Sequence, residues 1–255
     1  MAINSKGQYV HHGVLQLGFE MRRGMTKMPF VFQQPPLKAS RALYDGPKDR
    51  ATVYIMESSG GMVAGDRNDI TITIGKDANV TMIQQSALKI YPSPNEKVCV
   101  QEIVVKVGEH ARLEWMPEVI IPFREARFEM STTIEMCSTS TLIWGEIIAP
   151  GREKRGEIFD FESFRSKLSL HMDGQLIALD SLSLKPGEMN LQAIGMLENA
   201  QYIGSIWVVS PNVQTLDVRE IQQTFLNHSS VKVAITRLDR NAIHCRFLSE
   251  EQWEM

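Results

Sequence analysis

Two carboxylates interrupt apolar stretches of this sequence, at positions where a charge is costly. Glu146 stands in the run 142–148, Leu-Ile-Trp-Gly-Glu-Ile-Ile, and Asp180 stands in the run 176–182, Leu-Ile-Ala-Leu-Asp-Ser-Leu. An ionised group inside a strand has to face water, an opposite charge or a polar cavity. The two residues therefore predict either a solvated outer face or an internal water-filled passage. Such a passage suits a divalent cation that binds weakly, because carboxylates and water release an ion that thiolates would trap.

A glycine-rich segment at 60–66 superficially resembles a phosphate-binding loop. In that loop Lys and then Ser or Thr follow the last glycine, and a helix comes next. Here an aspartate and an arginine follow, and a strand is expected after them. We therefore expect a tight turn with positive φ at one or more of its glycines, Gly60, Gly61 and Gly65. Asp66 either caps this turn or serves as a placed carboxylate.

Ser86 and Lys89 match the S-x-x-K motif, in which a lysine helps to activate a serine nucleophile. That motif opens a helix and requires K-T-G elsewhere, which this sequence lacks. The residues that follow, Ile-Tyr-Pro at 90–92, disfavour a helix. No G-x-S-x-G motif occurs either. A catalytic serine is therefore disfavoured.

The histidines and cysteines form no pattern typical of a tight metal site. None of the six histidines lies in H-x-x-x-H or near a cysteine at zinc-site spacing, and we expect each at the surface. His11 and His12 point opposite ways in an extended segment and cannot easily share a metal. The three cysteines are widely spaced and form no C-x-x-C, which indicates free thiols in a reducing cytoplasm. They are Cys99, Cys137 and Cys245.

Composition places the chain among ordinary globular proteins. Of its 255 residues 43% are hydrophobic and 22% are charged, and the net charge is −3 with a pI of about 6.1. This charge disfavours general nucleic-acid binding. No apolar run is long enough to span a membrane, and the first residues lack the pattern of a secretory signal. No composition shift marks a linker, so we expect a single domain over residues 1–255.

Alternating patterns predict strands over most of the chain. Asp69–Gly75 and Gln101–Gly108 alternate β-branched and polar residues, which is typical of half-buried strands. Shorter runs of this kind occur at Ala51–Met56, Val80–Gln84, Arg112–Met116, Thr132–Met136, Thr141–Ile148, Lys167–His171, Leu176–Leu184, Ile206–Ser210, Val231–Thr236 and Ala242–Leu248.

A weak internal repeat suggests how these strands are arranged. The segment from Ile70 is similar to the one from Glu102, and a third copy places Cys137 where Gly75 and Gly108 stood. The steps between copies are 33 and 29 residues. Regular strand–turn–strand units favour a β-helix-like stack of many short strands, although a meander or sandwich would leave a similar trace. The fold class is therefore mainly β.

About two α-helices are expected beside the strands. A Ser-Pro cap and an apolar stripe predict one helix over Pro211–Asn227, and Glu188–Ala200 is a second candidate. Ser249 and the acidic residues after it resemble a capping box that opens a further helix. The sequence stops at Met255, so we expect that this C-terminal helix is truncated.

The loop 150–157 is charged, with the sequence Pro-Gly-Arg-Glu-Lys-Arg-Gly-Glu. It is interpreted as an exposed connection, as a docking loop for a partner, or as a turn fixed by an ion pair between Arg152 and Glu157. A surface pair alone would contribute less than about 1 kcal/mol.

Five segments together give the sequence a resemblance to the urease accessory protein UreD family, called UreH in some organisms. They are SSGGMVAGD (Ser58–Asp66), QQSALKIYPS (Gln84–Ser93), LEWMPEVIIPFREARF (Leu113–Phe128), WGEIIAPGREKRGEIFDF (Trp144–Phe161) and CRFLSEE (Cys245–Glu251). Family members usually continue past the last segment with a helix that carries Trp and Arg.

The resemblance implies a non-enzymatic role in a complex. UreD-like proteins join UreF and the GTPase UreG on the structural subunits of apo-urease and help to insert nickel, with no tightly bound cofactor of their own. Their fold is a β-helical stack with two helices. Nickel is thought to pass along a polar tunnel, whose carboxylates on matched positions would be Asp66, Glu146 and Asp180. The remaining motif residues would stabilise turns or dock partners: Lys89, Tyr91, Arg152 and Glu157.

Two other functions remain open on the sequence. One is a β-solenoid hydrolase that uses Ser86 and Lys89, or a pair of carboxylates; a cluster of Asp66, Glu146 and Asp180 in an open cleft would favour it. The other is a purely structural bridge between proteins, without an ion path.

Overall fold

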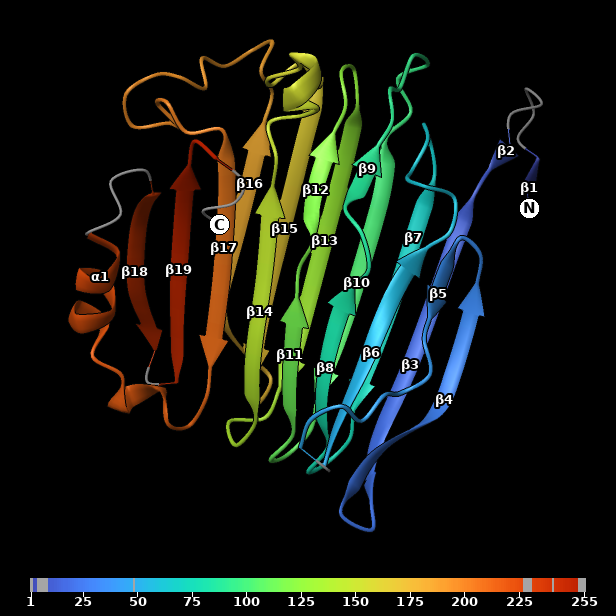
Figure 1. Cartoon of the computed structure of the whole chain (residues 1–255), viewed down its shortest axis with the longest axis vertical. Helices are drawn as coiled ribbons and strands as arrows, with labels where there is room; N and C mark the ends of the chain where they lie inside the picture. The colour runs from blue at the N-terminus through green and yellow to red at the C-terminus, as the bar shows by residue number, and fades with distance from the viewer. Residues whose placement is uncertain (1, 4–8, 48, 227–230, 240, 252–255) are drawn as a thin grey trace.

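Two β-sheets face each other across an apolar core (Figure 1). The computed structural model describes residues 2–3, 9–47, 49–226, 231–239 and 241–251. The first sheet has seven strands in the order β16-β15-β13-β10-β7-β3-β4. Their bounds are β3 (His12–Arg22), β4 (Met25–Gln34), β7 (Arg67–Ile74), β10 (Cys99–Val107), β13 (Arg127–Met136), β15 (Ser163–Met172) and β16 (Gln175–Leu184).

The second sheet has ten strands, eight of which follow the order β18-β19-β17-β14-β11-β8-β6-β5. Their bounds are β5 (Leu37–Ala39), β6 (Arg50–Glu57), β8 (Asn79–Gln84), β11 (Arg112–Met116), β14 (Thr141–Ile148), β17 (Tyr202–Val209), β18 (Val231–Asp239) and β19 (Ala242–Ser249). Two short strands, β9 (Leu88–Ile90) and β12 (Val119–Pro122), extend this sheet beside β14. Two further short strands, β1 (Ala2–Ile3) and β2 (Tyr9–Val10), pair with each other.

The middle of the molecule is a stack of strand–turn–strand coils, as the internal repeat predicts. Each coil places one strand in each sheet: β7 and β8, then β10 and β11, then β13 and β14. Successive strands are parallel, and Ile70 pairs with Ile103, which pairs with Thr132. These partners lie 33 and 29 residues apart, which are the steps of the sequence repeat. The prediction of a mainly β, stacked fold is confirmed.

Alternation along each strand decides which side chains enter the core. In β7, Ile70, Ile72 and Ile74 are buried. The neighbouring strands β11 and β14 stack Trp115 on Trp144 with ring centroids 4.5 Å apart. Aromatic pairs on neighbouring strands pack the centre of the sandwich, because their large side chains fill the space between the sheets.

The described residues contain one α-helix, α1 (Val218–Leu226), where the sequence predicted about two. Within the predicted range 211–227, a short 3-10 turn at Val213–Thr215 ends at extended Leu216. The helix then begins later, because the Asp217 carboxylate accepts the N–H of Arg219 and caps a new start. The predicted end at residue 227 lies outside the described residues.

The second predicted helix, at 188–200, is wrong. This segment is a series of turns, anchored in the core by Leu191 and Leu197. The capping box at Ser249 falls at the end of β19, where the Ser249 hydroxyl accepts the N–H of Glu251; residues 252–255 lie outside the described residues. None of the described helices is long and apolar enough to cross a membrane.

Candidate functional site

Glu146 lies on the inner face of β14, in the row formed by Leu142, Trp144 and Ile148. The Trp144 indole N–H donates to its Oε1 at 3.1 Å, and the Ser166 hydroxyl of the opposite sheet lies 3.4 Å from its Oε2. Burial raises the pKa of Glu146 to about 7, and the negative charge of Asp180 adds to this effect against the indole hydrogen bond. The carboxyl is therefore part protonated and part ionised near neutral pH.

Asp180 reaches the same region from β16 and is paired with an arginine. Its Oδ2 lies 2.6 Å from a guanidinium nitrogen of Arg246 on β19, and both side chains are 28% exposed. Arg246 partly offsets the effect of Asp180 on Glu146. The two carboxylates predicted from the sequence are thus brought together from the two sheets, together with a cation.

A small enclosed cavity joins these groups. It measures about 10 Å³ and is lined by Glu146, Ser166, Asp180, Ser205 and Arg246 together with apolar neighbours. A second cavity of about 20 Å³ lies on the other side of Glu146 and includes Gln84, Gln101 and Glu118. Each has room for about one water molecule. Polar groups therefore flank Glu146 on both sides within the sandwich.

A larger apolar pocket connects Glu146 with the outer face of the second sheet. Its volume is about 270 Å³, and its wall is formed mainly by Met116, Pro117, Ile143, Ile147 and Phe247. The pocket lies where β11 ends and the chain continues to β12, so Gly145 and Glu146 of β14 have a strand partner on the β17 side alone.

Glycine lets the Pro117 ring lie against β14 beside Glu146. At Gly145, which also lines the pocket, a Cβ atom would lie 2.9 Å from the Pro117 ring. Because glycine has no Cβ, Pro117 can pack directly against the strand backbone. The pocket is thus an apolar mouth that leads to Glu146 and Ser205.

A row of buried polar side chains extends from this site across the first sheet. Asn68, Gln101, Met130 and Ser166 are register partners on neighbouring strands, and all four are buried. The Gln101 amide donates to the Met130 sulfur at 3.6 Å, and the Asn68 amide nitrogen has no hydrogen-bond partner among the described residues. Since buried polar groups are normally satisfied, this row marks a path suited to water.

Asp66 is placed differently from the other two predicted carboxylates. It is buried, and its two oxygens accept the main-chain N–H groups of His11 and Val63, each at 2.9 Å. Gly60, Gly61 and Gly65 all have positive φ in the turn before it. Asp66 therefore caps this turn and ties it to the N-terminal segment. The cavities that Glu146 lines do not include it.

Three of the four motif residues pack together around Phe123. The Tyr91 ring meets Phe123 edge-on at 4.9 Å, and the Arg152 guanidinium lies 4.2 Å from the centre of the Phe123 ring. Arg152 also forms an ion pair with buried Glu157, with 2.8 Å between Nε and Oε2, and lowers the pKa of that carboxyl. This group fixes the turn after β14.

Lys89 contacts the glycine-rich turn through its main-chain carbonyl. Its carbonyl accepts the N–H of Met62 at 2.8 Å, and a Cβ atom at Gly61 would lie 2.5 Å from that oxygen. The Lys89 side chain itself is exposed. Ser86 is also exposed, and no hydrogen bond between the Ser86 and Lys89 side chains is present.

Four further residues at the site were not predicted from the sequence: Ser166, Ser205, His244 and Arg246. His244 was expected at the surface, but it is partly buried, stacks on Trp207 at 3.9 Å and shares a 2.8 Å hydrogen bond with Ser205. Burial lowers its pKa to about 4, so it is neutral at pH 7. Ser205 could have been predicted, because it is a polar residue inside an apolar strand, the same pattern that identified Glu146.

In the part of the chain that the structure describes, no three His, Cys, Asp or Glu side chains gather closely enough to hold a metal ion. A carboxylate pair with one arginine therefore offers a weak contact for a cation, and a tight site would need further ligands.

The sequence model of the family described as "UreD urease accessory protein" matches residues 11–255. The chain belongs to the UreD family. The resemblance inferred from the five sequence segments is thus confirmed.

Curated UreD proteins are similar over nearly the whole chain. The urease accessory protein UreD of Lysinibacillus sphaericus (strain C3-41) is 54% identical over 242 residues, which cover 95% of this chain and 90% of that protein. The UreD protein of Sporosarcina pasteurii is 39% identical, with 91% of each chain covered. That of Halalkalibacterium halodurans is 38% identical, with 96% of this chain and 89% of that protein covered. The family supports a role in urease maturation.

Proposed function

We propose that this chain is a non-enzymatic scaffold that binds apo-urease together with UreF and UreG and conducts nickel through its interior to the urease active site. The observation that carries the proposal is the interior site of Glu146, Asp180 and Arg246, which an apolar mouth joins to the outer face. Partly buried charged groups are costly, and their presence between two sheets whose facing sides are otherwise mainly apolar calls for a role other than stability.

The chemistry of Glu146 suits a transient contact with Ni²⁺, which is the cargo of the protein. With a pKa of about 7, the carboxyl can exchange its proton for a cation near neutral pH. Arg246 neutralises Asp180 and keeps the total negative charge of the site low. A site with one available carboxylate releases the ion readily, as a conduit requires.

The polar row defines a route for the ion within the sandwich. Asn68, Gln101 and Ser166 provide oxygens along the first sheet, and Met130 is the apolar member of the row. The present cavities each hold about one water, so an ion that keeps part of its hydration shell needs side chains to move. Met130 is suited to such movement because its thioether side chain is unbranched and flexible.

The partners follow from the family and from what the sequence lacks. GTP hydrolysis has to come from UreG, because the glycine-rich segment lacks the lysine of a phosphate-binding loop. UreF would link this chain to UreG in an oligomeric complex in the cytoplasm. The ordered turn that contains Arg152 and Glu157 is a candidate docking surface for one of them.

A co-expression experiment tests the conduit. Wild-type chain and the double variant Glu146→Gln/Asp180→Asn are each produced with UreF, UreG and the urease subunits, and the purified urease is assayed for activity and nickel content. We expect UreF capture to be unchanged and nickel per urease to fall at least about tenfold. The control is Glu135→Gln, which removes an exposed carboxylate of β13 that is 53% exposed.

Equal nickel loading by the double variant and the wild type would remove the conduit role and leave a structural bridge. Loss of UreF capture in the double variant, but not in the control, would show instead that the interior pair acts on assembly. The assignment of this chain to the UreD family would stand with either result.

A further inference from the structure

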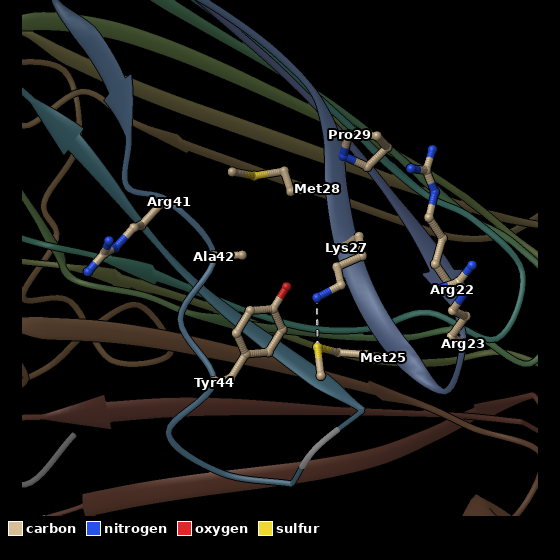
Figure 2. A pocket seen from close by; sticks show the side chains of 9 residues that line it. All are labelled: Arg22, Arg23, Met25, Lys27, Met28, Pro29, Arg41, Ala42 and Tyr44. Atoms are coloured by element: carbon tan, nitrogen blue, oxygen red, sulfur yellow. Dashed lines mark hydrogen bonds between the residues drawn. The ribbon is translucent and has the colours of Figure 1, made fainter.

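A broad pocket at the far end of the first sheet lies outside the proposed nickel path. It measures about 800 Å³ and is formed by the β3–β4 hairpin and the segment 41–44 that faces it (Figure 2). The hairpin turn is tight, with positive φ at Arg23 and Gly24. This turn holds Arg22 and Arg23 together at the tip.

The lining of this pocket is cationic. Four basic residues and no acidic residue line it, although the whole chain carries a net charge of −3. They are Arg22, Arg23, Lys27 and Arg41, and of these Arg22 forms an ion pair, with Glu20.

Lys27 occupies an unusual environment for an ammonium group. Figure 2 shows it pointing across the pocket toward Met25 and Tyr44. Its nitrogen lies 2.8 Å from the Met25 sulfur and 4.9 Å from the centre of the Tyr44 ring, and none of the described carboxylates forms an ion pair with it. A sulfur and an aromatic face leave most of its charge unsatisfied, so an anionic group would be a better partner.

The openness of the pocket indicates the kind of anion. Arg22, Arg23, Arg41 and Tyr44 are all exposed. A site for a small molecule typically encloses most of its ligand, which this surface cannot do. An extended protein segment needs no enclosure and can place several carboxylates along such an open, basic surface.

The pocket continues into an apolar strip on the same strand. Phe30, Val31 and Phe32 of β4 are 52%, 42% and 47% exposed. Among the described strands β4 pairs with β3 alone, and on its other edge Thr26 forms hydrogen bonds with Asp49 and Tyr44, so the edge without a further strand begins after Thr26. A long apolar edge strand is a ready template for an added strand.

We propose that this surface, the β4 edge with its basic pocket, binds an extended acidic segment of a partner protein. The segment adds to the edge of β4, sets apolar side chains against Phe30 and Phe32, and places carboxylates beside Arg23 and Lys27. Charge complementarity supplies the selectivity, and the strand edge supplies main-chain hydrogen bonds. The inference does not depend on nickel passage.

Fluorescence anisotropy with a labelled peptide tests the proposal on the full chain. The probe is an acetylated octapeptide in which Glu alternates with Val, and the reference peptide alternates Lys with Val. We expect the acidic peptide to bind, the basic one not to bind, and the affinity to fall as salt is raised. Failure of the acidic peptide to bind, or equal binding of both peptides, overturns the proposal.

Charge-reversal variants locate the binding surface. Arg23→Glu/Lys27→Glu should weaken peptide binding at least about tenfold, and so should Arg22→Glu/Arg23→Glu, which changes exposed residues alone. The matched control is Lys167→Glu/Arg219→Glu, which changes the net charge equally at exposed positions elsewhere and should alter affinity less than about twofold.

Equal weakening by the control would show a non-specific charge effect and overturn the assignment to this pocket. Binding of a single-stranded oligothymidylate as tight as that of the acidic peptide would also overturn it, in favour of a nucleic-acid partner. The variant Phe30→Ser/Phe32→Ser should weaken the peptide as well, and an unchanged affinity would overturn the part assigned to the strand edge.

Discussion

At the scale of the residue, Glu146 combines two properties that a core residue rarely has. Its carboxyl group lies among apolar side chains, and an apolar mouth still connects it with the outer face of the sheet. Burial raises its pKa to about 7, and Asp180 adds to the shift. The folded protein therefore favours the protonated carboxyl, and ionisation of Glu146 lowers the free energy of unfolding.

The pH dependence of stability follows from this shift. The ordinary pKa of 4.5 applies to the unfolded chain, so below pH 4.5 both states are protonated and Glu146 carries no penalty. Between pH 4.5 and the folded pKa of about 7, the unfolded chain loses its proton more readily than the folded protein, so the unfolded state is increasingly favoured, by up to about 3 kcal/mol, and above pH 7 this loss of stability is constant. Glu146→Gln has no ionisable group at this position and therefore lacks this pH-dependent loss of stability. Urea unfolding should show that the free energy of unfolding of the variant, relative to that of the wild type, is higher at pH 8 than at pH 5. The same difference at both pH values would contradict the raised pKa.

A second prediction concerns the pair of Arg152 and Glu157. Glu157 is 6% exposed, and Arg152→Ala leaves it without its ion-pair partner and removes the cation that covers Phe123. We expect a loss of about 2–3 kcal/mol in the free energy of unfolding, less than for a fully buried pair because Arg152 is partly accessible. The control Arg155→Ala, at an exposed position, should change stability by less than about 0.5 kcal/mol; an equal loss in both would show that the pair does not hold the turn.

Residue types predicted part of the site and could not predict the rest. Glu146 and Asp180 were identified because each interrupts an apolar strand, and the structure brings them together. Their arginine partner lies 66 positions beyond Asp180, and no local pattern reports such a contact. Asp66 also lies in one of the five UreD-like segments, as Glu146 does, yet its oxygens accept hydrogen bonds from the backbone at a turn.

At the scale of the element, glycines set the shape of the connections between coils. Gly61 and Gly60 are neighbours in one turn, and both have positive φ. At Gly61 a Cβ atom would lie 2.5 Å from the Lys89 carbonyl, whereas at Gly60 nothing lies within 4 Å. The close approach holds the turn against β9.

This difference gives a matched pair of variants. Gly60→Ala should cost about 1 kcal/mol, because alanine is disfavoured at positive φ but has space there. Gly61→Ala should cost about 3 kcal/mol or more, because the added carbon meets a backbone oxygen as well. Thermal unfolding of the two variants measures which one loses more stability. Equal losses would show that the turn can move to accommodate the Cβ at position 61.

Strands were easier to predict than helices, for a physical reason. In β7 and β10 the alternation reports the two faces of a strand directly, and the repeat steps reproduce the register between coils. The hairpin of β3 and β4 was not predicted, although β3 alternates, because β4 is exposed on both faces along its second half. The segment 188–200 was a second helix candidate, but the structure has turns there, with the apolar Leu191 and Leu197 anchored separately in the core.

At the scale of the whole molecule, the stack aligns equivalent positions of successive coils. Polar residues at one inward position of successive strands therefore produce a row, as with Asn68, Gln101 and Ser166, which Met130 of β13 interrupts between Gln101 and Ser166. A parallel stack is well suited to build such a row, because register repeats from strand to strand. The polar row and the apolar core around it thus come from a single architecture.

The row should be dispensable for folding and needed for nickel delivery. Gln101→Met replaces a buried amide, which donates a hydrogen bond to the Met130 thioether, by an apolar side chain of similar size. We expect the free energy of unfolding to stay within about 1 kcal/mol of the wild type or to rise. Nickel content of co-expressed urease should fall several-fold. A variant that loses stability but loads nickel normally would contradict a conducting role for the row.

The most direct test of the nickel path is the pH dependence of nickel transfer. Initial rates of radioactive nickel incorporation into apo-urease are measured between pH 6 and pH 8 in the assembled complex, with wild-type chain or Glu146→Gln. The ratio of variant to wild-type rate cancels the pH responses of the partners. If Glu146 with its pKa of about 7 carries the ion, the ratio falls as the pH rises, because the wild-type carboxylate becomes available and the amide does not. A ratio that stays near one at every pH would contradict passage through this interior site.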